Sequence, residues 1–357
     1  MMWSMWPSDV RRGERFFPCS LVSPIINAAV TTRAWPLPEP LDDVKLARIH
    51  TVATASRHST TISGPSALRQ LALAAARSAT RVLDPPNKHQ VNDGTVRWGT
   101  THKTNHHDVV TDLDRAVEIH LREFLHERLP TSQIFGEEFG EHSPTGTSAL
   151  EPRPDHAVVW LIDPIDGTSN LAHGLDTYSI SIAAVIDDQV LAGVVVAPAM
   201  GLEFSADIES GTAWVNDSKL RVRRPCPQRL QDYNLVTSFP AAEILQASPP
   251  TPHTALEIFG QAVCQFSTVR RMVSGALELC LAAQGVFDLV IGVDTKPWDI
   301  AAAQLILQCA GGHYRPGWFS PAESGPAHRA PCYLGLAPGR DPAAASEIFE
   351  RILHLPR

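Results

Sequence analysis

Asp163 and Asp166 follow a short apolar run and are separated by a Pro-Ile pair, an arrangement suited to chemistry. The proline enforces a turn, and such a turn can direct both carboxylates and the Ile165 carbonyl at one point. Carboxylates held close together repel each other unless a cation lies between them, and hard oxygen donors favour Mg²⁺ over zinc or copper. Gly167 and Thr168 then offer backbone N–H groups that can bind a phosphate. On its own the stretch is more typical of an ordinary turn, and a magnesium-dependent phosphate site is the alternative that other segments could support.

Three other segments carry groups that could complete this site. Glu137 follows a glycine and precedes a second glutamate, and Asp299 stands after Pro-Trp at the start of a predicted helix. Asp114 lies near the start of another predicted helix, downstream of Lys103. Taken alone, each has a structural interpretation, because acid pairs are common on surfaces and acids at helix starts cap the helix or complement its dipole. A capping carboxylate can also project into a cleft, so the two roles of Asp299 are compatible.

The elements that must position these residues are predicted from hydrophobic periodicity. Apolar stripes predict helices over 66–83, 274–284, 300–309 and 343–353, and a helix that begins near 111, with a buried face formed by Leu113, Val117, Leu121, Phe124 and Leu125. Apolar runs predict strands over 158–162, 178–185, 189–196 and 287–291, with a hairpin turn at Asp187-Asp188. Strands that alternate with helices, plus one antiparallel hairpin, indicate an α+β fold in which helices cover sheets.

Composition excludes several classes of protein. The 357 residues are 44% hydrophobic and 19% charged, which is ordinary globular usage rather than that of a disordered or fibrous chain. The 30 basic and 38 acidic residues give a net charge of −8, which argues against a general nucleic-acid or anionic-membrane binder. No apolar run reaches the ~18 residues of a membrane helix, and the six cysteines show no paired spacing. We therefore expect a cytoplasmic enzyme with reduced thiols.

The first 62 residues differ from the rest in composition and hydrophobic pattern, with several Pro and Trp residues and no sustained periodicity. We expect a flexible N-terminal extension, with organelle targeting as a weaker alternative; a secretory signal fits poorly because Pro24 and Asn27 interrupt its apolar stretch. The remainder is expected to form an N-terminal α+β half over 63–230, which carries most of the candidate ligands, and a C-terminal half over 231–357, which completes the site.

Three motifs, taken together and in this order, resemble the signatures of the inositol monophosphatase family. They are the Gly-Glu137-Glu loop, the Asp163-Pro-Ile-Asp-Gly-Thr turn and the Trp-Asp299 helix start. That family is part of the lithium-sensitive, magnesium-dependent sugar-phosphatase superfamily. The resemblance covers roughly residues 65–355. It implies a layered αβαβα sandwich of the inositol monophosphatase and fructose-1,6-bisphosphatase type, with the site where the two halves meet, and a chain that is commonly a homodimer.

The resemblance also implies which residues bind two to three Mg²⁺ ions. Glu137, Asp163 and the Ile165 carbonyl would hold the first ion. Asp163, Asp166 and Asp299 would hold the second, and a third, weaker ion would lie near Glu137. Two such ions can activate a water molecule and stabilise the leaving oxygen of a phosphate ester.

By the same resemblance, Thr168 and Asp114 form the pair that orients and deprotonates the attacking water, and Lys103 lies near the phosphate. The helix start at Ser274-Gly275 would line the pocket for a sugar-sized group. The catalytic residues implied are Thr168, Asp114, Glu137 and Asp163. The substrate-binding residues implied are Asp166, Gly167, Thr168, Lys103, Ser274, Gly275 and Asp299.

The implied substrate is a small phosphorylated polyol or sugar, with inositol 1-phosphate first. Animal-type members carry a glutamate seven residues before the Trp-Asp aspartate to bind inositol hydroxyls, but here that position is Gly292. A buried hydroxyl needs a partner, and Asp294 could substitute from two residues along. Histidinol phosphate is the first alternative, followed by fructose 1,6-bisphosphate and 3′-phosphoadenosine-5′-phosphate.

The alternative to an enzyme is a non-catalytic regulatory binding protein, since some family members have such roles. Clustered carboxylates argue against it, because a scaffold has no physical need for side chains that repel one another without a metal. Nucleic-acid binding is supported only by a short basic run, which is more typical of a solvated strand end: Arg221, Arg223, Arg224 and Arg229.

Overall fold

The computed structural model describes residues 64–83, 100–102, 109–141, 156–320 and 322–356. The predicted N-terminal extension, Lys103 and the Asp108 region therefore lie outside the described residues. By its contacts the chain divides into the unit Met1–Trp35, which falls outside those residues, and the unit Pro36–Arg357, which contains all of them. No helix in the described part is both long and apolar enough to cross a bilayer.

The α-helices confirm most of the predicted ones. Their bounds are α2 Pro65–Leu83, α3 Asp112–Arg128, α4 Thr168–Ala172, α5 Ala242–Gln246, α6 Thr251–Gln265, α7 Gly275–Ala283, α8 Pro297–Cys309 and α9 Ser346–Leu353. The predicted face of α3 is buried, except that Phe124 is only partly so. α8 begins three residues earlier than predicted because Pro297, which lacks an N–H, suits the first helical position.

A seven-stranded sheet forms the N-terminal part of the fold, in the order β3-β4-β5-β6-β7-β8-β9. Its strands are β3 Gln133–Gly136, β4 Val159–Asp166, β5 Ser179–Ile186, β6 Gln189–Ala197, β7 Leu202–Asp207, β8 Thr212–Val215 and β9 Ser218–Lys219. The β5–β6 hairpin turns at Asp187 and Asp188, both with positive φ, as the sequence predicts. β3 pairs with β4 in parallel, and the other neighbouring pairs are antiparallel.

The prediction that β4 stops at Asp163 is wrong, since the strand continues to Asp166. Asp163 pairs with Ser181 and Asp166 with Ser179, so three steps along β4 match two along β5. The extra residue makes a β-bulge, which bends a strand and redirects its side chains. Both carboxylates therefore stand on a rigid strand rather than on a free turn.

A second, five-stranded sheet follows in the order β11-β10-β12-β14-β13. Its strands are β10 Asn234–Thr237, β11 Thr268–Arg270, β12 Leu289–Val293, β13 His313–Gly317 and β14 Cys332–Leu336, and a separate ribbon pairs β1 Thr100–His102 with β2 Val109–Thr111. The sheets change between β9 and β10, close to the boundary expected at residue 230. The division into two halves at that boundary remains a prediction.

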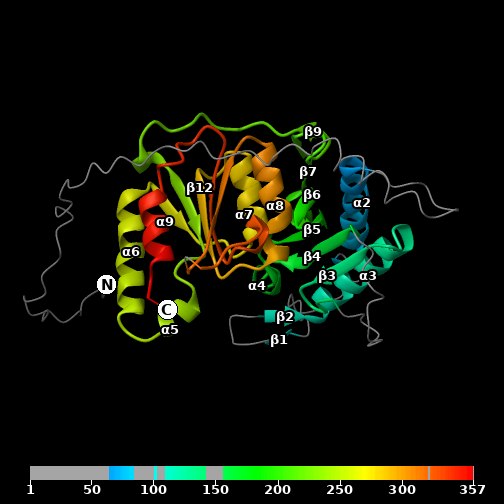
Figure 1. Cartoon of the computed structure of the whole chain (residues 1–357), viewed down its shortest axis with the longest axis horizontal. Coiled ribbons are helices and arrows are strands. Elements are labelled where there is room, and N and C mark those ends of the chain that lie inside the picture. Colours follow the sequence, from blue (N-terminus) through cyan, green and yellow to red (C-terminus); the bar gives the residue numbers. More distant parts are fainter. Residues whose placement is uncertain (1–63, 84–99, 103–108, 142–155, 321, 357) are drawn as a thin grey trace, which may run out of the picture. The chain divides into compact units, whose positions relative to one another are not determined.

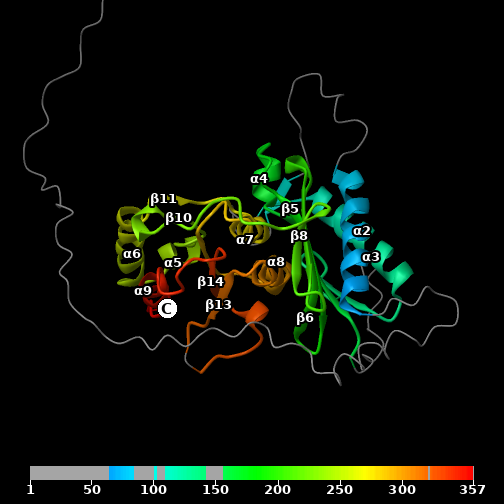
Figure 2. The ribbon, with the colours of Figure 1, turned by 90° about the horizontal axis from the view of Figure 1, so that it is seen from above.

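Five layers result, as Figures 1 and 2 show: α2 and α3, the large sheet, α7 and α8, the small sheet, and finally α6 with α9. Three apolar cores fill the four interfaces, with the core around α7 and α8 touching both sheets. This is the α+β layered sandwich that the resemblance implies.

Close contact between β6 and α8 fixes the central layer against the large sheet. A Cβ added at Gly193 would lie 2.5 Å from the Ala302 carbonyl oxygen and 2.8 Å from its Cα. Only glycine allows this approach. Because Asp299 lies one turn before Ala302, the same contact sets the position of the acidic residue at the start of α8.

Candidate active site

A pocket of about 260 Å³ brings together almost all of the predicted site residues. Those that line it are Glu137, Asp163, Ile165, Asp166, Gly167, Thr168, Ser274, Gly275 and Asp299. Asp114 lies beside them through a contact with Thr168, whereas Lys103 falls outside the described residues. The side chains come from β3–β4, from the start of α4, and from the N-terminal ends of α7 and α8.

Asp163 lies at the centre of the acidic cluster and is only 3% exposed. Burial raises its pKa well above the usual range, and the neighbouring charges of Glu137, Asp166 and Asp299 raise it further. Its carboxyl group is also hydrogen-bonded to that of Glu137. Two carboxyl groups approach so closely only when a proton or a cation is shared between them.

Asp299 reaches the same cluster from the first turn of α8. Its carboxylate accepts a 2.8 Å hydrogen bond from the Lys296 backbone N–H, which closes a capping box at the start of the helix. Burial and the Glu137 charge raise the pKa of Asp299 well above its ordinary value. The capping and site-facing roles expected for this residue therefore occur together.

Asp166 connects the β4 strand to the N-terminus of α7. It accepts hydrogen bonds from the Ser274 hydroxyl at 2.7 Å and from the backbone N–H groups of Gly275 and Ala276 at 3.0 and 2.9 Å. Burial raises its pKa to about 6, although these donors act in the opposite direction. Asp166 thus holds the positive end of a helix against the pocket.

Thr168 and Asp114 form the second predicted constellation. The Thr168 hydroxyl lies 2.7 Å from Asp114 Oδ1 and 2.9 Å from the Ile165 carbonyl oxygen. A hydroxyl has one proton to donate, so donation to the fully buried Asp114 leaves its lone pairs available to a neighbouring group. The pair can therefore relay a proton from the pocket to Asp114.

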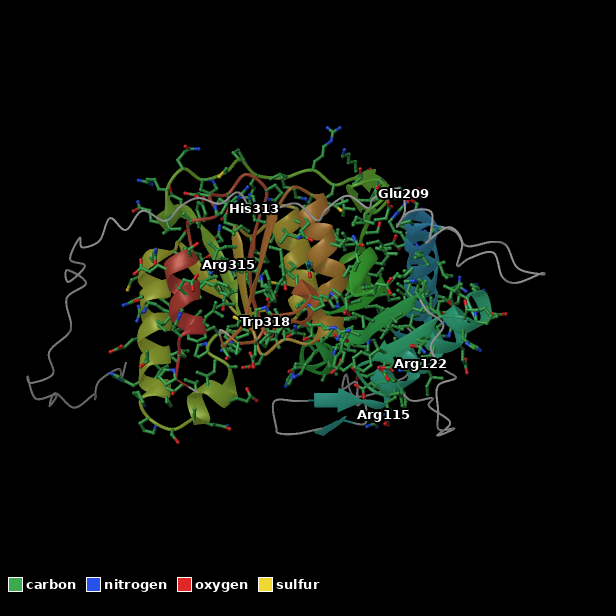
Figure 3. The ribbon with its side chains drawn as sticks, in the orientation of Figure 1. Arg115, Arg122, Glu209, His313, Arg315 and Trp318 are labelled. Atoms are coloured by element: carbon green, nitrogen blue, oxygen red, sulfur yellow. The ribbon has the colours of Figure 1, made fainter. Side chains whose placement is uncertain are left out.

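The Glu137 loop is held by two residues that the sequence analysis missed. Glu118 Oε2 accepts the backbone N–H of Glu138 at 2.8 Å, and Arg122, bonded to Glu118, donates to the Gly140 carbonyl at 2.5 Å. Both project from α3, as Figure 3 shows for Arg122. Charged residues one turn apart on a helix resemble a solvated surface pair in a sequence, yet both are buried here.

Glu278 is a further acidic residue that the sequence analysis missed. It lies on α7, lines the pocket and is 3% exposed. Burial, followed by the charge of Asp166, raises its pKa to about 8. A single acid within the otherwise apolar run Ala276–Ala283 is the signal that could have identified it.

The pocket wall at Gly292 lacks the acidic side chain that would bind the hydroxyl groups of a polyol. Gly292 pairs with Tyr333 across β12 and β14, and a Cβ at Gly292 would lie 2.2 Å from the Tyr333 ring. The aromatic ring therefore occupies the space of any larger side chain at this position. Asp294, two residues along, does line the pocket.

The donor set fits a hard divalent cation, because carboxylates that raise one another's pKa are stabilised by shared positive charge. Within the described residues, no three His, Cys, Asp or Glu side chains stand at the spacing of a preformed metal site. Glu137, Asp163, Asp166 and Asp299 would therefore have to draw together around an ion.

Comparisons with known sequences identify relatives of the chain. Residues 65–317 match the inositol monophosphatase family. The chain is 34% identical over 242 residues to Nus factor SuhB of Pasteurella multocida, covering 68% of this chain and 82% of that protein. It is 29% identical over 223 residues to a fructose-1,6-bisphosphatase/inositol-1-monophosphatase of Aquifex aeolicus, covering 62% and 78%. An inositol-1-monophosphatase of Rhizobium meliloti is 32% identical over 225 residues, covering 61% and 74%.

Solved structures share the fold. An IMPase of Thermotoga maritima has a TM-score of 0.62 at 24% identity, over 80% of this chain and 98% of that one. The extragenic suppressor protein SuhB of Bartonella henselae has a TM-score of 0.63 at 24% identity, over 81% and 98%. At these identities, the similarity to solved structures establishes the layered fold alone. The chemistry has to be inferred from the residues that line the pocket.

Proposed function

The chain belongs to the inositol monophosphatase family, and from this premise we propose that it is a Mg²⁺-dependent phosphate monoester hydrolase acting on inositol 1-phosphate. The observation that carries the proposal is the convergence of Glu137, Asp163, Asp166 and Asp299 on one pocket next to the Thr168–Asp114 pair. A binding surface alone gains nothing from such mutual repulsion.

In this proposal the acidic cluster holds two to three Mg²⁺ ions. Glu137, Asp163 and the Ile165 carbonyl would hold one ion, and Asp163 would share the next with Asp166 and Asp299. When bound, these ions would supply positive charge that activates water and offsets the charge of the phosphate. Asp163 is the ligand that serves both ions, so its loss is expected to matter most.

The protein's own groups then orient the reaction. Gly167 and Thr168 line the pocket, and their backbone N–H groups would hold the phosphate oxygens, whose charge spreads in the transition state. The Thr168 hydroxyl would accept a hydrogen bond from the attacking water and pass its own proton to Asp114. Thr168 is too weak a base by itself, and the buried carboxylate of Asp114 supplies the missing basicity.

The substrate is proposed to be a phosphorylated ring of sugar size. Inositol 1-phosphate is our first choice because inositol-1-monophosphatases are among the relatives, and fructose 1,6-bisphosphate is a related choice. Histidinol phosphate remains the alternative, because Gly292 and Tyr333 stand where an acidic partner for polyol hydroxyls was expected.

A panel of phosphate-release assays tests the proposal. Inositol 1-phosphate, histidinol phosphate and fructose 1,6-bisphosphate should be compared with Mg²⁺, with a chelator in place of Mg²⁺, and with added Li⁺. We expect hydrolysis that requires Mg²⁺ and is inhibited by Li⁺, fastest for inositol 1-phosphate. Absence of Mg²⁺-dependent phosphate release from all three compounds would contradict the proposal.

The second candidate is a regulatory binding protein, because several relatives are named Nus factor SuhB rather than phosphatase. The two candidates differ in their dependence on the acidic cluster. A binding role on another surface should survive Asp163→Asn, whereas hydrolysis should not.

A further inference from the structure

Val273 has a backbone conformation that its side chain disfavours. Its φ is +58°, in the left-handed region, where a β-branched side chain is especially costly. Among the described residues, the other non-glycine positions with positive φ are occupied by His, Asp and Asn: His156, Asp187, Asp188, Asn216 and Asp294. A valine in this conformation requires surroundings that impose it.

Groups on both sides of the chain impose this conformation. The buried Glu278 carboxylate accepts backbone N–H groups from Met272, Val273 and Ser274. On the carbonyl side, the amide of Asn170 donates to the Met272 oxygen at 2.6 Å and lies 3.4 Å from that of Val273. The segment 272–274 is thus fixed by α7 and by α4 together.

The strain is not explained by packing, because the Val273 side chain does not enter a core. It is 56% exposed and lines the pocket. Its backbone oxygen lies 3.1 Å from where a Cβ at Gly167 would be, so it adjoins the proposed phosphate-binding turn. Tyr333 and Val293 contribute further apolar surface to the pocket. A strained and exposed residue in the wall of a pocket points to a function in that pocket.

We propose that Val273 is a specificity-determining residue that contacts the hydrocarbon face of a ring-shaped leaving group. This inference rests on the proposed phosphomonoesterase function and narrows its substrate class. The C–H face of an inositol ring or the face of an aromatic ring would contact the two methyl groups of Val273. A short hydroxylated chain such as glycerol would not make this contact, because water satisfies its hydroxyl groups.

Val273→Ala tests the contact with three substrates: inositol 1-phosphate, phenyl phosphate and glycerol 2-phosphate. We expect KM to rise about 3–10-fold for the two ring substrates, the scale of losing one or two methyl contacts. For glycerol 2-phosphate, KM should change less than about twofold. The kcat values should stay close to those of the wild type, because Val273 touches no reacting atom and its contact is the same in the ground and transition states.

Val263→Ala is the matched control, because Val263 is 52% exposed on α6 and lies outside the pocket lining. It should leave every KM unchanged. Val273→Gly provides a readout independent of activity: glycine accepts the left-handed conformation without cost, so the thermal midpoint should rise while ring selectivity is lost.

The outcomes separate this inference from the function it rests on. If the wild type releases phosphate from none of the three substrates, the proposed function fails and takes this inference with it. If the wild type is active but Val273→Ala raises all three KM values equally or none of them, only the role of Val273 is overturned. A fall in thermal midpoint for Val273→Gly would overturn the strain on which the role is based.

Discussion

The Thr168 hydroxyl and Asp114 Oδ1 are 2.7 Å apart, although Thr168 begins α4 and Asp114 lies in the first turn of α3. The contact joins the proposed phosphate-binding turn to a buried carboxylate on another helix. Asp114 is 1% exposed, so the hydrogen bond is formed away from bulk water, where it is stronger.

Removing the Thr168 hydroxyl should therefore separate metal binding from turnover. We expect Thr168→Ala to lower kcat by roughly 10²–10⁴-fold, the usual contribution of a positioned proton acceptor, while Mg²⁺ binding measured by calorimetry is retained. Thr212→Ala is the control, because Thr212 also makes a local hydrogen bond but lies half-buried on β8, outside the pocket. An unchanged kcat in Thr168→Ala would remove Thr168 from the reaction.

Asp163→Asn should abolish turnover without unfolding the protein. The substitution keeps the shape of the side chain but removes the charge that two ions would share, and we expect kcat to fall by on the order of 10³-fold or more. In a chelator, the thermal midpoint should be equal to or higher than that of the wild type, because an amide relieves repulsion from Glu137 and Asp299. Near-normal hydrolysis with Mg²⁺ would contradict the assignment of Asp163.

Stability of the metal-free protein should fall as pH rises. The folded-state pKa of Asp166 is about 6, above its ordinary 3.8, so between these values the folded state binds more protons than the unfolded chain. The free energy of unfolding therefore decreases from about pH 4 through about pH 6, and Glu278, with a pKa of about 8, extends the decrease to about pH 8. A shift of about two pKa units in Asp166 corresponds to at most about 3 kcal/mol.

Urea denaturation in the presence of a chelator, from about pH 5 to about pH 8, measures this dependence. Comparison with Glu278→Gln isolates one group, because the variant should lack the contribution of Glu278 to the decrease up to about pH 8. Parallel pH profiles for the two proteins would show that Glu278 does not titrate as its burial predicts.

The Gly193 contact with α8 should control both stability and activity. Gly193→Ala places a Cβ 2.5 Å from a backbone oxygen that cannot rotate away, so we expect destabilisation of about 1–3 kcal/mol and a displaced Asp299. Gly260→Ala is the matched control: nothing lies within 4 Å of its Cβ, and alanine in the interior of α6 should stabilise by roughly 0.5–1 kcal/mol. Equal effects of the two substitutions would contradict the importance of this close approach.

The sequence predicted the elements better than the geometry between them. Periodicity located α2, α3 and the β5–β6 hairpin because each buries a continuous apolar face. The continuation of β4 through Asp163 was missed, since a proline there indicates a strand end unless a bulge accommodates it. The gathering of the four acids came from the family resemblance, as residues so far apart in the chain have no periodicity in common.

Residues that act through burial were the hardest to predict. Glu118 and Arg122 read as a surface pair, and only the packing of α3 against the Glu137 loop makes them a buried support. Tyr333 was missed for a related reason: its ring fills the space beside Gly292 through a strand pairing that no local pattern encodes. The strain at Val273 likewise depends on Glu278 and Asn170, which approach from different helices.

The shared use of Asp166 by the pocket wall and by the start of α7 has a consequence for engineering. Residues 64–230 cannot be expected to work as a miniature enzyme, because without the later helices Asp166 loses the donors at the start of α7 and Asp299 is missing altogether. Truncated or proteolysed forms should have no measurable activity rather than reduced activity. The rate of hydrolysis would therefore report whether the central helical layer is intact.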